Sequence, residues 1–453
     1  MNYFFGLLSS ISYLFVMGLI FRKIFLHSDF WPIFLSIEYF YILGLGIFPL
    51  FLFLGFVQIP PLFELYNYVD SINPLTFFHI GFYAFGSLIG FFYSKKLSTA
   101  GVAYLLKKTA RIKFNPLSFF YLLAIFSIIS SVIYFWIVGF DRAILGASAS
   151  RGGDFSDFEG FEEFVFLKRF AIVGLYGVAA FPFIFAGKKN IALSFFTFFS
   201  VGILGYVMTV SRFALFEGFV TPLLMYLAYT KSTSMLKKFS IYFLIGVFCF
   251  AVFRFGKEFI GAIGSFLFSG TLIELSNVDH DVDFLSSFSH LFFSVDAGIN
   301  NFFSNGPFIA KDIILSVLGV VPSGVFSSLG LENLSYQLVN NESRFSCINS
   351  EKLIGNNADC IIPPYYIGAS AYFFPLGGAF LFGFFRFYLY SVMHRTWIFL
   401  RGKETLLVLP YIIFLVLNQV MLFIPATISL AVFFSILFFL YLIIINFLVK
   451  VKL

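Results

Sequence analysis

The sequence predicts an all-α, polytopic integral membrane protein with about 11 transmembrane helices and one large loop on the outer side of the membrane. Composition excludes an ordinary soluble domain. Of the 453 residues, 60% are hydrophobic and 11% are charged, whereas soluble domains carry about 25% charged residues. Phenylalanine alone contributes 74 residues, and the mean hydropathy is +0.95. This composition suits helices that face lipid.

Apolar runs of about 18–25 residues, the length at which a helix crosses a bilayer, follow one another along the chain. The long connection 257–365 separates helices 1–8, in residues 1–256, from helices 9–11, in residues 366–453. Within it, the glycine- and proline-containing run 313–330 fits a re-entrant or interfacial segment better than a full span. In chain order the predicted spans are 2–21, 31–57, 75–94, 116–139, 165–187, 190–210, 213–230, 239–256, 366–393, 405–425 and 427–448.

Basic residues orient these spans, because lysine and arginine concentrate on the cytoplasmic side of a membrane protein. Most of them follow the odd-numbered spans: Arg22, Lys23, Lys95, Lys96, Lys107, Lys108, Arg111, Lys113, Lys188, Lys189, Lys231, Lys237, Lys238, Arg395, Arg401, Lys403, Lys450 and Lys452. Acidic residues such as Glu64, Asp70 and Asp157 lie in the opposite connections. We therefore expect the N-terminus and the long connection outside, and the C-terminus in the cytoplasm. The net charge of +6 reflects these flanks and has no pattern typical of nucleic-acid binding.

A second set of cations lies at the outer ends of spans, where the same rule makes them scarce. Arg169 opens the fifth span, Arg212 opens the seventh, and Arg254 and Lys257 close the eighth. Like charges gathered at one depth of a low-dielectric boundary need an anion. A diphosphate headgroup suits them, because the arginine fork matches its oxygens.

The alternative is that each outer cation pairs with a nearby acid or extends to the interface. Arg254 and Glu258 are four residues apart, and Arg212 is five residues from Glu217. Arg386, in the cytoplasmic half of its span, is expected to extend to the interface.

The loop stretch NVDHDVDFLSSFSHLFFSVDAG (277–298) carries the densest group of acids and histidines. Its DHDVD segment is too short to identify a metal site, and a solvated turn is the competing interpretation. His290 and Asp296 flank an apolar patch and are candidates for a general base. Cys347 and Cys360 lie in the same long connection, where an oxidising compartment would let them pair. Two free thiols are the alternative.

Several stretches together resemble the Wzy-type O-antigen polymerases, nearest in pattern to the enterobacterial common antigen polymerase group. The stretches are LKRFAIVGLYG (167–177), TVSRFALFEGF (209–219), FRFGKEFIG (253–261), VVPSGVFSSLG (320–330) and IGASAYFFPLGGAFLFGF (367–384). The resemblance implies an inner-membrane glycosyltransferase that joins undecaprenyl-diphosphate-linked oligosaccharide repeats, as donor and acceptor, on the periplasmic face. A chain-length regulator is then a possible partner, and no cofactor or metal is expected.

The resemblance also implies which residues act. Arg169, Arg212 and Arg254 best match the periplasmic arginines that engage diphosphates in that family, and Lys257 and Arg344 are second choices. The chain departs from the family pattern before the ninth span, where some relatives have a loop histidine. Here NNADC (356–360) offers an asparagine and an aspartate instead. The candidates for a base that assists the acceptor hydroxyl are Glu258, His290 and Asp359.

Two other functions fit the same layout. An O-antigen ligase shares the architecture but transfers the chain to the lipid A core. A flippase or other transporter of lipid-linked oligosaccharide would place charged residues along a path through the membrane midplane. Glu38 and Glu217 are the main charged residues that lie inside predicted spans, away from the outer face.

Overall fold

In the computed structural model, the regular secondary structure of the described residues is entirely helical and contains no strand. The described residues are 2–26, 38, 40–60, 63, 71–94, 116–139, 167, 200, 285, 288–307, 328–331, 345–355, 365–399, 436, 440–441 and 443–444. The all-α class is therefore confirmed for this part of the chain. The chain divides into two compact units: the first comprises Met1–Leu105, Asp281–Phe399 and Ile412–Ser435, and the second comprises Leu106–His280, Leu400–Tyr411 and Ile436–Leu453.

Among the residues that the structure describes, three helices are long and apolar enough to cross a membrane, as expected of an integral membrane protein. They are α1 (Asn2–Leu26) and α4 (Pro74–Ser94) of the first unit and α6 (Pro116–Val138) of the second. They coincide with the first, third and fourth predicted spans. In the second unit, the Phe119 ring of α6 lies 4.9 Å from the Tyr441 ring. The total of about 11 spans, and the side on which each terminus lies, stay predictions.

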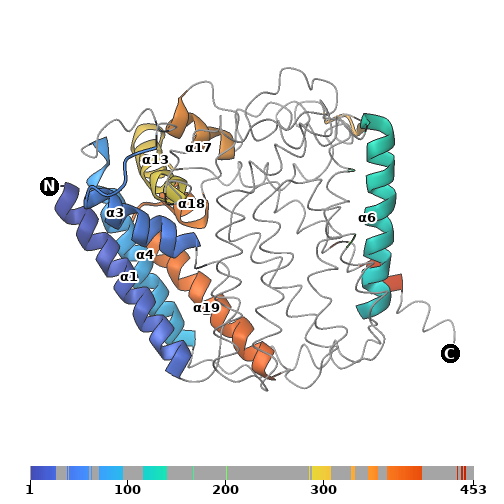
Figure 1. The fold of residues 1–453 in the computed structure, drawn as a ribbon, viewed down its shortest axis with the longest axis horizontal. Coiled ribbons are helices and arrows are strands. Elements are labelled where there is room, and N and C mark those ends of the chain that lie inside the picture. The colour runs from blue at the N-terminus through green and yellow to red at the C-terminus, as the bar shows by residue number, and fades with distance from the viewer. Residues whose placement is uncertain are drawn as a thin grey trace. The chain divides into compact units, whose positions relative to one another are not determined.

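In the first unit, α1, α4 and α19 (Gly377–Phe399) lie side by side and run in the same direction (Figure 1). The direction of α1 along α4 follows from two contacts. The Asn2 side-chain amide donates to the Ile72 carbonyl at 2.9 Å, and the Phe5 ring lies 5.4 Å from the Phe78 ring. The charge rule also requires the first, third and ninth spans to share one direction.

Small residues let α4 and α19 approach backbone to backbone. A Cβ atom added at Gly86 would collide with the Phe380 carbonyl, and one at Gly90 would collide with the Phe384 carbonyl. Both helices advance by four residues between these contacts, so they are parallel. Such GxxxG spacing permits close packing in membranes, where dispersion and not hydrophobic burial drives helix association.

The second predicted span contains a change of helical pitch. The π-helix η1 (Ile42–Ile47) is followed directly by the short helix α3 (Phe48–Phe53). Both run antiparallel to α1, since Gly46 lies against Tyr13 while Phe53 lies against Gly6. π-helical turns frequently occur at functional sites.

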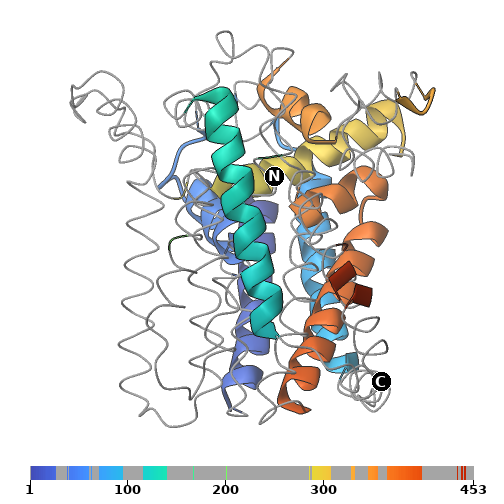
Figure 2. The same cartoon turned by 90° about the vertical axis from the view of Figure 1, so that its right-hand side faces the viewer.

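Part of the long connection 257–365 folds as helices that pack into the first unit. Helix α13 (Ser289–Asn305) places Phe292 against Phe53 and Phe77, with ring centroids 6.3 Å apart in both pairs. Helix α17 (Phe345–Ile354) lies near it. Figures 1 and 2 show α13, α17 and α18 (Tyr365–Phe373) at the end of this unit where α1 and α4 begin.

The predicted ninth span, 366–393, is not one continuous helix. Helix α18 ends at Phe373 and α19 begins at Gly377, because Pro375 cannot continue a helix and Leu376 adopts a φ of 66°. The span prediction was wrong here about continuity.

Candidate functional site

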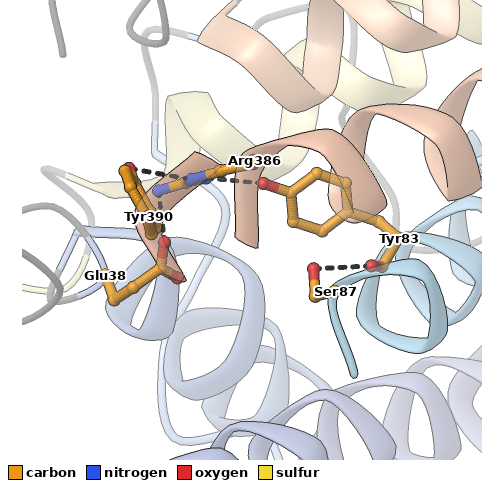
Figure 3. Close-up of polar contacts among 5 residues, drawn as sticks. All are labelled: Glu38, Tyr83, Ser87, Arg386 and Tyr390. Carbon is orange, nitrogen blue, oxygen red and sulfur yellow. Dashed lines mark hydrogen bonds and ion pairs between the residues drawn. The ribbon is translucent and has the colours of Figure 1, made fainter. Parts of the chain in front are cut away.

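A buried ion pair lies about midway along the helices of the first unit. Nη2 of Arg386, in α19, is 2.5 Å from Oε1 of Glu38, and both side chains are fully buried (Figure 3). The two residues come from the predicted ninth and second spans. Ionisable groups inside a membrane are costly and usually occur in pairs that face the interior of the bundle.

The rest of the guanidinium is surrounded by tyrosines from three segments. Nη1 donates to the Tyr83 hydroxyl of α4 at 2.5 Å, and Nε donates to the Tyr390 hydroxyl, one turn along α19, at 3.2 Å. The Tyr41 ring lies flat beneath the charge, with the guanidinium carbon 3.6 Å from the ring centroid. Phenol oxygens and a π face replace the water that the arginine loses on burial.

This arrangement corrects the expectation that Arg386 extends to the interface. The side chain stays at mid-depth, where Glu38 balances its charge and the Tyr83 and Tyr390 hydroxyls accept hydrogen bonds from two of its N–H groups. The sequence held one signal for this, namely two opposite charges inside predicted spans. It held no signal that the second and ninth spans are neighbours.

The polar network around the pair is incomplete. No hydrogen-bond partner occurs, among the residues the structure describes, for Glu38 Oε2, the Tyr13 hydroxyl or Ser391 Oγ, although all three are buried. The contact between Glu38 Oε1 and Arg386 Nη2 is ionic and lacks the angles of a hydrogen bond. Each unsatisfied buried group destabilises the fold by about 1–3 kcal/mol. The charge pair and the contacts of Arg386 with the surrounding tyrosines must offset this cost.

A buried histidine, His79, makes hydrogen bonds to α18 and to the break between α18 and α19. Nδ1 of His79 accepts from the Leu376 backbone N–H at 3.3 Å, so Nε2 carries the ring hydrogen and donates to Ser370 Oγ at 2.8 Å. The Ser370 hydroxyl in turn donates to the Ile367 carbonyl at 2.6 Å. The bond to His79 satisfies the Leu376 N–H, a backbone group at the break between the two helices.

Asp296 of α13 caps the start of α4. Its Oδ1 accepts from the Asn73 backbone N–H at 2.8 Å and from the Thr76 hydroxyl at 2.6 Å, and its Oδ2 accepts from the Asn300 side-chain amide at 2.8 Å. A carboxylate at a helix N-terminus is stabilised by the unpaired N–H groups and by the helix dipole. Since Asp296 is fully buried, these contacts favour a structural role over general-base work.

His290 is in a more open place, at the start of the same helix. It is half-buried, and its Nε2 lies 2.6 Å from the hydroxyl of Tyr365, the first residue of α18. The two rings lie 5.0 Å apart between centroids, with 33° between their planes. The sequence analysis named His290 but not Tyr365, because no pattern in the sequence places these two residues together.

The other predicted site residues lie outside the described part of the chain: Arg169, Arg212, Arg254, Lys257, Glu258, Arg344 and Asp359. The DHDVD segment and Cys360 also lie outside it. Cys347 belongs to α17, and its pairing with Cys360 stays open. In the described ranges, no group of three or more histidine, cysteine or acidic side chains is arranged to hold a metal ion. Comparisons with protein-family models, with curated proteins and with solved structures find no match.

Proposed function

We propose that this membrane protein is a glycosyltransferase that polymerises undecaprenyl-diphosphate-linked oligosaccharide repeats on the periplasmic face of the bacterial inner membrane. The observation that carries the proposal is the location of His290. This half-buried imidazole belongs to α13, at the end of the first unit where α1 and α4 begin (Figure 1). The charge rule makes that end the outer one. The predicted cations Arg169, Arg212 and Arg254 belong to the same face by the same rule.

The proposed reaction needs a base and fixed positive charge. A hydroxyl of the acceptor sugar attacks the anomeric carbon of the donor, and its proton passes to His290. The bond from the anomeric carbon to the lipid diphosphate breaks, and its electron pair leaves with the diphosphate. Arginines preorganised around that group stabilise the charge that develops on it. Glu258 and Asp359 are the alternative bases.

The test is the length of the surface glycan in a deletion strain complemented with wild-type or variant protein. Loss of a polymerase leaves single repeats on the lipid A core, whereas loss of a ligase leaves none. Arg212→Ala and Arg254→Ala should abolish long chains while protein levels stay near normal. Unchanged chain-length ladders in both variants would contradict the diphosphate role. Reporter fusions at residues 150 and 310 should give periplasmic signals.

The Glu38–Arg386 pair favours a second candidate, a transporter of the lipid-linked oligosaccharide. Paired charges midway along membrane helices occur in transport pathways. A transporter defect leaves lipid-linked repeats on the cytoplasmic leaflet, whereas a polymerase defect leaves them on the periplasmic leaflet. The accessibility of the accumulated repeats to an impermeant glycosidase therefore separates the two functions.

A further inference from the structure

His290 has a partner on another helix that the reaction scheme above does not use. The Tyr365 hydroxyl lies 2.6 Å from its Nε2, a short distance for a hydrogen bond of this kind. The phenol and imidazole rings also face each other across 5.0 Å. Both side chains are half-buried, so the pair is neither sealed in the core nor fully in solvent.

The two helices that carry the pair are packed in register. Helices α13 and α18 run parallel, and His290 faces Tyr365 where both begin. One turn further along, a Cβ added at Gly368 would lie 3.0 Å from the Ser294 Cβ, and the next turn brings Gly298 against α18. Small residues at these positions leave the helices little freedom to slide, which fixes the distance between the two rings.

Tyr365 also has an unusual backbone. Its φ is 54°, in the left-handed region that a bulky aromatic residue rarely adopts. It follows Pro363 and Pro364 and opens α18. Non-glycine residues held in this region are concentrated at functional sites, where the surrounding structure maintains the strain.

A phenol suits a base that must change its charge. A neutral imidazole has one nitrogen that donates and one that accepts, whereas the imidazolium donates from both. In the neutral ring, Nε2–H donates to the Tyr365 hydroxyl oxygen, so the lone pair that takes up the proton is on Nδ1. In the imidazolium the same Nε2–H still donates to the Tyr365 hydroxyl oxygen. The contact therefore survives proton transfer, and it strengthens when the ring becomes charged, because charge-assisted hydrogen bonds are about twice as strong as neutral ones.

We propose that Tyr365 is the positioning residue for His290 as the general base of glycosyl transfer, an inference that rests on the proposed function. The acceptor hydroxyl loses its proton to the imidazole as its oxygen bonds to the anomeric carbon. The bond from that carbon to the lipid diphosphate breaks, and the diphosphate takes the electron pair. Tyr365 holds the ring in place and stabilises the imidazolium that forms.

The experiment uses membranes of the deletion strain that contain the full-length protein, supplied with lipid-linked repeats extracted from the same strain. The rate of chain extension is measured from pH 5 to pH 9 for wild type, His290→Gln, Tyr365→Phe and Tyr366→Phe. Tyr366 is the matched control, because its ring packs on Phe382 at 4.6 Å. The rate at which diethyl pyrocarbonate modifies His290 is measured in the same membranes.

His290→Gln should lower the extension rate about 10²- to 10⁴-fold. Tyr365→Phe should lower it about tenfold, move the acid limb of the pH profile to lower pH and speed the modification of His290. Tyr366→Phe should change none of the three. Wild-type activity in His290→Gln, or an unchanged pH profile and modification rate in Tyr365→Phe, would overturn the inference but leave the polymerase intact. Wild-type membranes that extend no chains would overturn both.

Discussion

Two polar regions in the described part of the first unit differ in burial and in the contacts that their side chains make. The mid-depth region is a fully buried charge pair, Glu38 and Arg386, surrounded by tyrosines. The end region joins α13 to α4 and α18, through Asp296, which is buried, and His290, which is half-buried. The first region joins helices by charge, whereas the second combines a helix cap with an accessible imidazole.

The difference shows that two properties, burial and the number of hydrogen-bond or ion-pair partners, separate structural polar groups from candidate reactive ones. Arg386 donates to two phenols and pairs with a carboxylate, and Asp296 accepts from three donors. Both have exchanged water for protein contacts and are poorly placed to meet a substrate. His290 alone among these three is partly exposed.

The largest expected effect comes from breaking the ion pair. Arg386→Ala leaves the Glu38 carboxylate buried without its cation and should destabilise the fold by about 3–5 kcal/mol. Thermal unfolding of the purified protein in detergent measures the change. Glu38→Gln combined with Arg386→Met removes both charges and should recover most of the loss, because replacing a whole buried pair by neutral groups is often nearly neutral.

Arg22→Ala is the matched control, since Arg22 is an exposed arginine near the end of α1. It should change the unfolding midpoint little. If Arg386→Ala unfolds at the wild-type temperature, the mid-depth region does not stabilise the bundle. Full chain extension by the double variant would favour a structural role for the pair over a transport role.

A smaller effect is expected where α4 meets α19. Gly90→Ala places a methyl group against the Phe384 carbonyl and should cost about 1–3 kcal/mol through strain and separation of the helices. Gly81→Ala is the control, because a Cβ there meets nothing within 4 Å, and alanine is the better helix former. Equal unfolding midpoints for the two variants would contradict the close packing.

The smallest expected effect on stability comes from Asp296→Asn, and the comparison with His290→Gln tests which of the two residues acts as the base. Asp296→Asn keeps one carbonyl oxygen for Asn73 and Thr76 but loses the carboxylate bond to Asn300, so it should cost about 1 kcal/mol. Chain-length ladders should stay like those of the wild type. His290→Gln should do the reverse, with normal stability and lost chains. Lost chains in a stable Asp296→Asn protein would instead identify Asp296 as a base.

Sequence patterns predicted some features of this unit and missed others for physical reasons. Spans 2–21 and 75–94 match α1 and α4, because an apolar run of that length can satisfy its backbone in lipid only as a helix. The break near Pro375 was missed, because residues 366–393 were predicted as one span although proline interrupts helices. Helix α13 was missed because its polar residues suggested a loop, whereas Asp296 and Asn300 are satisfied by groups at the start of α4.

The sequence by itself predicted a helical membrane protein, and the described residues agree, because composition and the length of apolar runs act locally along the chain. It also determined which residue types were available for chemistry, His290 among them. Only the tertiary structure decided that Arg386 pairs with Glu38 and that His290 meets Tyr365. Both contacts join segments far apart in the chain, and they depend on which helices become neighbours and in what register. That choice is made by packing between small residues and by the high cost of leaving a charge unpaired in a low dielectric.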